Sequence, residues 1–78
     1  MKKQGVVIDY DGYDGIIETA MKEQYILLRS ETVNNEELKK LDYVSFVPET
    51  KKYTDEEFNI ARFVRKLTRN PNNRDLNI

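Results

Sequence analysis

The hydrophobic residues of this chain come in short clusters, and this spacing is the strongest limit on its fold. The longest apolar runs, such as Val6–Ile8 and Tyr25–Leu28, hold three or four residues. Such runs are too brief for an ordinary helix and far below the roughly 20 apolar residues that span a membrane. Their content of β-branched and aromatic residues favours strands. The sequence therefore predicts short β-strands and no membrane association.

Length and composition narrow the possible chemistry. The chain has 78 residues and lacks Cys, His and Trp. A chain of this size forms one modest core, and without Cys and His it has no disulfides, no histidine acid–base chemistry and no common zinc site. A pair of catalytic carboxylates needs a cleft that so small a domain does not enclose. We therefore predict a protein that is not an enzyme and uses no cofactor and no metal.

Charge is balanced overall but unevenly distributed. The chain carries 13 basic and 14 acidic residues, for a net charge of −1. Five of the basic residues and only one acidic residue fall within positions 59–78, so a local basic patch is predicted. The start, Met1-Lys2-Lys3, is followed by no apolar signal region because Asp9 and Asp11 interrupt it, and a cytoplasmic location is expected.

Four strands are predicted from the apolar clusters and the turn residues between them. Asp11-Gly12 and Asp14-Gly15 mark a hairpin connection between the first two strands, since glycine adopts positive φ without strain. Asn34–Leu41 has the end charges of one or two helical turns. The polar stretch Glu49–Glu57 is predicted to be a hairpin loop. The four strands are Gln4–Tyr10, Ile16–Thr19, Tyr25–Leu28 and Asp42–Val47, the last ended by Pro48.

The segment from Thr54 to Arg69 is compatible with two structures. Thr54 and Glu57 form a capping-box pattern, and the apolar residues between Ile60 and Leu67 recur at helical spacing, which favours a helix over residues 55–69. Alternation around Phe58–Phe63 also permits a strand, and a fifth strand would close the open edges left by the other four. The two alternatives are an all-β barrel and an α+β fold with a C-terminal helix.

The order of these elements resembles the cold-shock domain, a small OB-fold. Gly5-x-Val7-x-x-Tyr10 resembles its G-x-V-x-x-F opening, and Gly12–Ile17 its G-F-G-F-I motif. Leu38–Phe46 is similar to L-x-x-G-x-x-V-x-F, and Ala61–Val64 resembles the closing A-x-N-V strand. The resemblance implies a five-stranded antiparallel barrel with a short helical turn between strands three and four. It makes residues 1–69 one domain, with Ile60–Lys66 as strand five and 70–78 as a flexible tail.

The same resemblance implies binding of single-stranded RNA or DNA by base stacking on surface aromatics. Most of the family's aromatic positions hold other residues here, including Asp9, Ile16, Ile26 and Leu28. Weak binding is therefore expected, with the carboxylates of the first turn repelling phosphates. The predicted nucleic-acid-binding residues are Tyr10, Tyr13, Arg29, Arg62, Arg65 and Lys66.

Three further interpretations of these residues remain open. The basic residues Lys51, Lys52, Arg62, Arg65, Lys66, Arg69 and Arg74 form either one phosphate-binding face or a solvated strand edge. The aspartates between Asp9 and Asp14 do not match an EF-hand and are better explained as turn residues. In the alternative function, Ile16, Ile26 and Leu28 form an apolar contact surface for a protein partner or a second copy of the chain.

Overall fold

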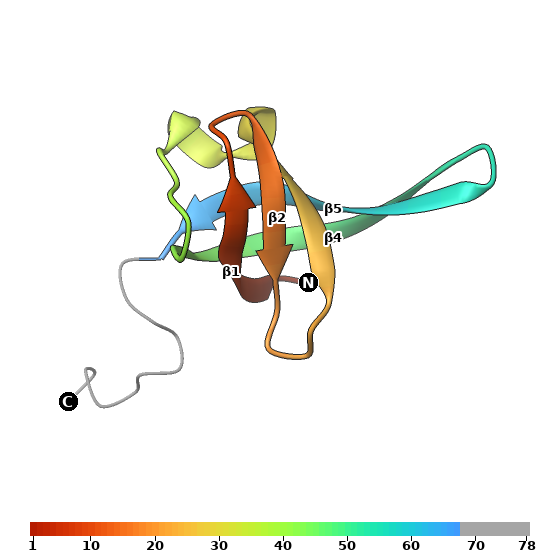
Figure 1. Cartoon of the computed structure of the whole chain (residues 1–78), viewed down its shortest axis with the longest axis horizontal. Helices are drawn as coiled ribbons and strands as arrows, with labels where there is room; N and C mark the ends of the chain where they lie inside the picture. Colours follow the sequence, from red (N-terminus) through yellow and green to blue (C-terminus); the bar gives the residue numbers. More distant parts are fainter. Residues whose placement is uncertain (68–78) are drawn as a thin grey trace.

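The computed structural model describes residues 1–67, which form a closed barrel of five strands (Figure 1). The strands follow one another around the barrel in the order β1-β2-β3-β5-β4. All neighbouring pairs are antiparallel except β3 with β5, which is parallel. The predicted all-β barrel of the OB type is confirmed. The strands are β1 (Lys3–Tyr10), β2 (Asp14–Glu18), β3 (Gln24–Leu28), β4 (Tyr43–Tyr53) and β5 (Glu56–Lys66).

The ambiguous C-terminal segment is a strand. β5 pairs with β4 along most of its length and meets β3 at Ile26 and Ile60, so the helical alternative over residues 55–69 is wrong for the part that the structure describes. A helix there would have left one edge of β3 and one edge of β4 without a hydrogen-bonding partner. Pairing these edges stabilises the fold more than the local helix signals favour a helix. The predicted tail, residues 70–78, lies outside the described residues.

The fourth strand is longer than predicted. β4 continues through Pro48 to Tyr53, and residues 49–53 pair with β5 instead of forming the expected loop. Proline is tolerated in a strand with an open edge, and β4 has β1 as a neighbour only as far as Phe46. Past the pairing of Ile60 with β3, residues 50–59 of β4, β5 and their turn form a two-stranded arm that projects from the barrel (Figure 1).

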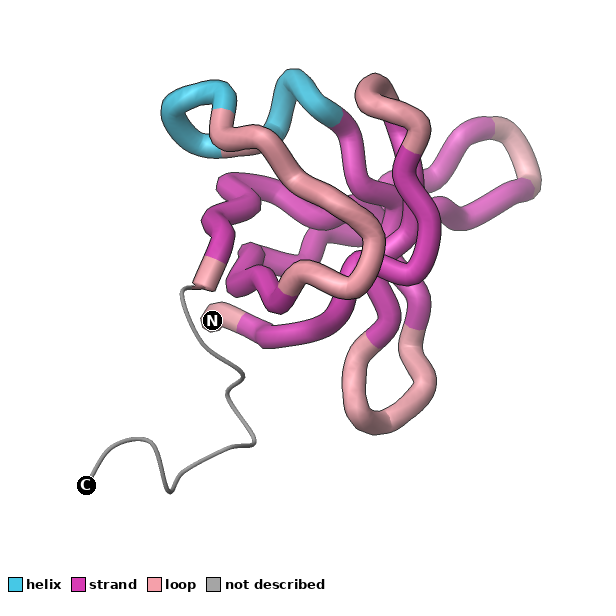
Figure 2. Tube along the Cα trace, turned by 60° about the vertical axis from the view of Figure 1, so that its left-hand side comes forward, coloured by secondary structure: helices cyan, strands magenta, loops and turns pink. Residues whose placement is uncertain are grey.

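The connection between β3 and β4 contains two 3₁₀ turns at one end of the barrel, η1 (Arg29–Glu31) and η2 (Val33–Asn35) (Figure 2). The helical turns predicted over Asn34–Leu41 are therefore wrong in position. Asn34 and Asn35 adopt positive φ angles of 59° and 52°, which stop a right-handed helix. Leu38 then turns inward and is buried.

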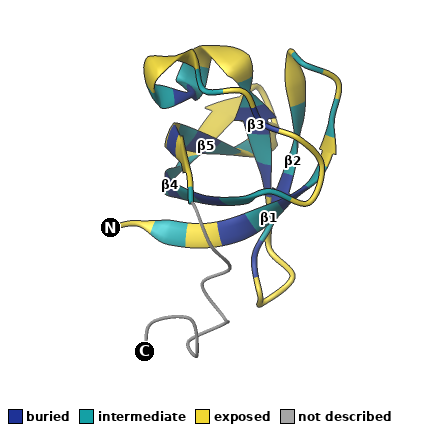
Figure 3. Cartoon of the chain, turned by 90° about the vertical axis from the view of Figure 1, so that its left-hand side faces the viewer, coloured by how far each residue is buried: buried dark blue, intermediate teal, exposed yellow. Residues whose placement is uncertain are grey.

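Every strand has buried positions (Figure 3). The side chains at these positions, together with Leu38, form the hydrophobic core. The rings of Tyr25 and Phe46 meet with their centroids 4.9 Å apart. Gly15 permits β2 to approach β1 closely, because a Cβ there would lie 2.1 Å from the carbonyl oxygen of Asp9. The largest fully buried side chains are Val7, Ile17, Leu27, Val44, Phe46 and Val64.

A bulge in β5 holds Phe63 in an unusual conformation. The register with β4 shifts between Ser45 and Val47, and Phe63 has a φ of 52° while its side chain is 61% exposed. Positive φ is costly for a bulky residue and well tolerated by asparagine. The closing motif that the sequence resembles, A-x-N-V, has asparagine at this position.

Replacing Phe63 by asparagine is expected to stabilise the barrel. Phe63→Asn relieves backbone strain and removes little buried surface, so the free energy of unfolding in urea should rise by about 1 kcal/mol. Phe63→Ala is the control, since it removes the same ring but keeps a side chain that disfavours positive φ. Equal stability of the two variants would show that strain at this bulge is not significant.

Candidate nucleic-acid interface

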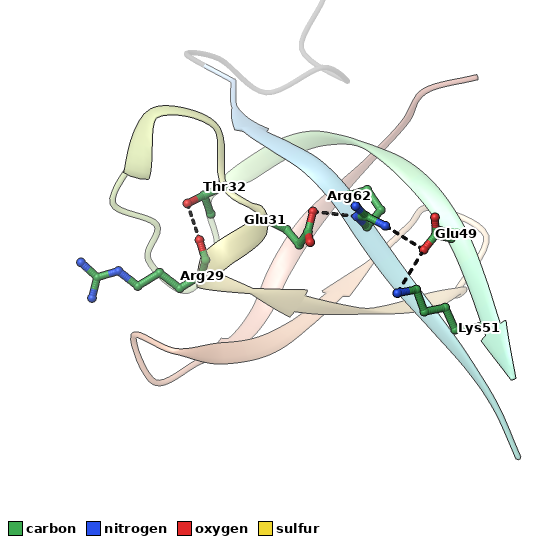
Figure 4. A network of polar contacts seen from close by, with 6 residues as sticks. All are labelled: Arg29, Glu31, Thr32, Glu49, Lys51 and Arg62. Carbon is green, nitrogen blue, oxygen red and sulfur yellow. Dashed lines mark hydrogen bonds and ion pairs between the residues drawn. The ribbon is translucent and has the colours of Figure 1, made fainter. Parts of the chain in front are cut away.

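Three of the predicted binding residues lie together at one end of the barrel. Tyr13 is in the turn between β1 and β2, and Arg29 follows β3 directly. The backbone N–H of Arg29 donates to the carbonyl oxygen of Tyr13 at 2.8 Å, which ties the two segments together. The Tyr13 side chain is 73% exposed. Arg29 forms no ion pair within residues 1–67, and its side chain points away from the neighbouring Glu31 (Figure 4).

Tyr10 belongs to the same end but is half-buried. Its ring packs against the core, and its hydroxyl donates to the carbonyl oxygen of Gly12 at 3.3 Å. Burial raises the pKa of the Tyr10 hydroxyl. Tyr10 also lines a cavity of about 190 Å³, together with the cations Arg29 and Lys39 and the acids Glu36 and Glu37. Tyr13 therefore supplies the exposed ring of this end, whereas Tyr10 is packed against the core.

The carboxylates of the first turn have different roles. Asp11 accepts backbone hydrogen bonds from Tyr13 at 2.8 Å and Asp14 at 2.9 Å. The bond from Asp14, followed by that from Tyr13, lowers the pKa of Asp11. Asp11 is thus a turn residue, as the sequence favours. Asp9 and Asp14 are exposed and form no ion pair within the described residues, so they keep a negative potential beside Tyr13.

Arg62 is already engaged by two acids. Its Nε lies 2.7 Å from Glu31 and its Nη1 lies 2.8 Å from Glu49 (Figure 4). The hydrogen bond to Glu31, then that to Glu49, raises the pKa of Arg62. Glu31 follows β3 and Glu49 belongs to β4, so Arg62 on β5 links three neighbouring strands. A phosphate would have to compete with both carboxylates for this guanidinium.

The other basic residues do not form one continuous face. In the β4–β5 register Lys51 lies opposite Phe58, whereas Lys66 lies opposite Val44 at the other end of the ladder. Lys66 pairs with Asp42 at 3.5 Å, and Arg65 is exposed without an ion pair in the described chain. Lys52 lies on the arm beside Lys51. The remaining members of the predicted cluster, Arg69 and Arg74, lie outside the described residues.

The residues of the alternative protein contact do lie side by side. Ile16 is directly opposite Ile26, which in turn neighbours Ile60 of β5. Leu28 lies opposite Asp14 on the same pair of strands. All of these isoleucines and Leu28 are half-buried. They form an aliphatic row across the outer side of β2, β3 and β5.

The sequence did not reveal which acids bond to Arg62 or which residues of β5 lie beside Ile26. Glu31 and Glu49 are distant in the chain from Arg62, and no local pattern connects them. Phe58 and Ile60 join the aliphatic row only because the segment is a strand, where residues two apart share a face. The alternation Phe58, Ile60, Arg62 was the available signal.

Within residues 1–67 no helix has the length and apolar character needed to cross a membrane. The same residues contain no group of three or more acidic side chains arranged to hold a metal ion. In comparisons with known proteins, no protein-family model matches the chain, and no curated protein matches it significantly.

Arg62 is expected to stabilise the barrel. Arg62→Gln removes both charge-assisted hydrogen bonds and leaves Glu31 and Glu49 facing each other, so the midpoint of urea unfolding should fall. Arg65→Gln is the matched control on the same strand and should have almost no effect. Added salt should reduce the difference between the two variants. Equal midpoints at low salt would show that the bridge contributes no net stability.

The turn formed by Asp11 predicts a specific pH dependence. Because its pKa is lowered from 3.8 in the folded protein, Asp11 stabilises the fold above about pH 4, and this stabilisation is lost as the pH falls through the lowered value. Asp11→Asn should therefore be less stable than the unmodified protein at pH 7 and equally stable near pH 2, measured by urea unfolding. A difference that stays constant over this range would contradict the charge-assisted turn.

Proposed function

We propose that this protein binds single-stranded nucleic acid weakly, at the end of the barrel that presents Tyr13 and Arg29. The observation that carries the proposal is the juxtaposition of an exposed tyrosine and an arginine that forms no ion pair within residues 1–67. An exposed tyrosine stacks on a base, and an adjacent guanidinium reaches its phosphate. The OB-type barrel and its likeness in sequence to the cold-shock domain support the same function.

The site is small, which is consistent with weak binding. Tyr13 is the exposed aromatic residue of this end, and Tyr10 lies beneath the surface. Asp9 and Asp14 oppose a phosphate backbone, and Arg62 is held by its two acids. We therefore expect contacts with about one or two nucleotides, with little sequence preference because any base offers a face for stacking. RNA and DNA should bind alike.

Binding of a labelled eight-nucleotide oligo(U) or oligo(dT) at low salt tests the proposal. Tyr13→Ala should weaken the affinity about fivefold or more, since a stacked base contributes about 1–3 kcal/mol. Arg29→Gln should reduce the slope of log K against log salt by about 0.7, the value for one phosphate contact on a single strand. Fluorescence anisotropy measures both quantities.

Matched controls for this experiment lie on the arm. Tyr53→Ala removes another exposed ring, and Lys52→Gln removes another unpaired cation. Neither is expected to change the affinity or its salt dependence. The proposal fails if Tyr13→Ala and Arg29→Gln bind as the unmodified protein does, or if the arm variants weaken binding equally.

The second candidate function is protein association through the aliphatic row. It is favoured by a specific observation, which is that Ile16, Ile26 and Ile60 are contiguous across three strands. Aliphatic side chains give no stacking platform for bases but suit a protein contact. This surface reaches Leu28, next to Arg29, but it includes neither Tyr13 nor Arg29. The two functions are therefore tested by different variants.

A further inference from the structure

The arm of the barrel has an unpaired strand edge. β5 contacts β3 in register only at Ile60, and the preceding residues Glu56–Asn59 pair with β4 on one side alone. Figure 1 shows this ribbon extending away from the other strands. An open edge of this kind offers backbone N–H and C=O groups to an added strand.

A groove lies between this edge and the outer side of β2 and β3. It encloses a volume of about 260 Å³. Its apolar wall is formed by Ile16, Ile26 and Phe58, and its polar rim includes Gln24, Glu57 and Asn59. The ring of Tyr53 extends the apolar wall along the arm, with its centroid 5.8 Å from that of Phe58. The groove thus continues the aliphatic row to the open edge.

Unpaired acids lie at both ends of this groove. Asp9 and Asp14 border the surface beside Ile16, and Glu56 and Glu57 lie on the open edge. None of these four carboxylates forms an ion pair within the described part of the chain. Two cations of this region are already engaged, since Arg62 bonds to two glutamates and Lys51 lies 3.8 Å from Glu49. Lys52 lies opposite Glu57 in the β4–β5 register and forms no ion pair within residues 1–67. The groove is therefore apolar at its centre and negative at its ends.

These charges select among the possible occupants. A nucleic acid would bring phosphates against carboxylates, and a second copy docked by the same face would bring acids against acids. A segment that carries basic side chains is attracted instead. A strand that pairs with Glu56–Asn59 presents alternate side chains to the groove, so its aliphatic residues would contact Ile26 and Phe58.

We propose that this groove binds an extended segment of a partner protein in which aliphatic and basic residues alternate. The segment pairs with β5 at Glu56–Asn59 and places its aliphatic side chains on the apolar wall. Its basic side chains alternate onto the other face of the added strand, which is the face of Glu57. The groove borders the end that holds Tyr13, since Asp14 directly follows that residue. Its apolar wall includes neither Tyr13 nor Arg29, and the inference does not depend on nucleic-acid binding.

Titration of the isotope-labelled full chain with three eight-residue peptides tests this inference. The peptides alternate Lys with Val, Glu with Val, and Lys with Ser. The Lys–Val peptide should give saturable amide shifts at Ile16, Ile26 and Glu56–Asn59. The other two peptides should bind about tenfold more weakly or not at all, because one reverses the charge and the other removes the apolar contact.

Variants locate the contact. Phe58→Ser should weaken binding of the Lys–Val peptide about tenfold, as expected for a central apolar contact. Glu57→Lys changes an exposed residue without touching the core and should also weaken it, so the test does not depend on the stability of one variant. Phe63→Ser, an exposed phenylalanine outside the groove, and Tyr13→Ala are the controls and should bind normally.

Four results would overturn the inference. They are equal binding of the three peptides, shifts confined to residues outside the groove, and normal binding by both Phe58→Ser and Glu57→Lys. The fourth is a shift of the groove resonances in the absence of peptide. A shift with protein concentration would indicate a second copy as the occupant, and a shift on addition of the oligonucleotide would indicate nucleic acid. If Tyr13→Ala no longer binds the oligonucleotide but still binds the Lys–Val peptide, the groove and the proposed nucleic-acid site act independently.

Discussion

The barrel depends on a short parallel contact between β3 and β5, where Ile26 meets Ile60. Without it the sheet would have two open edges, and the buried faces of both strands would be exposed to water. Arg62 reinforces this closure, because its guanidinium joins Glu31, just after β3, to Glu49 on β4. Arg62 was predicted from its charge to bind phosphate, but in the structure it helps to close the barrel.

Much of the fold was predictable because short apolar clusters and Asp-Gly turns have local causes. These signals located β1, β2 and β3 closely. The length of β4 and the arm was not predictable, since Pro48 ends a strand only where both of its edges are paired. Local sequence signals did not predict β5, because Ile60, Val64 and Leu67 recur at helical spacing. The segment is a strand because the barrel must be closed, and this outweighs the local helix preference. The open edges of the other four strands and the resemblance to the cold-shock domain both supplied that argument.

The candidate site was predictable in part for similar reasons. Tyr10, Tyr13 and Arg29 converge because strand ends joined by a tight turn lie close together. The ion pairs of the basic residues on β5 were not predictable, because a cluster of basic residues does not reveal which acids the fold brings close to it. Glu31 comes from the turn η1 and Glu49 from β4, and their ion pairs give Arg62 a structural role. The aliphatic row gained Ile60 and Phe58 in the same way.

The strands fall into two groups, and within each group the paired strands are close in sequence. β1, β2 and β3 are successive hairpins, and β4 with β5 forms another hairpin, so both groups have partners close in sequence. Within residues 1–67, the β1–β4 and β3–β5 pairings and a bridge between Thr32 and Val64 join the two groups. Because distant contacts form after local ones have shortened the loops between them, we expect folding to end with the docking of two preformed hairpin units. The bridge at Arg62 would then act chiefly on the rate of unfolding.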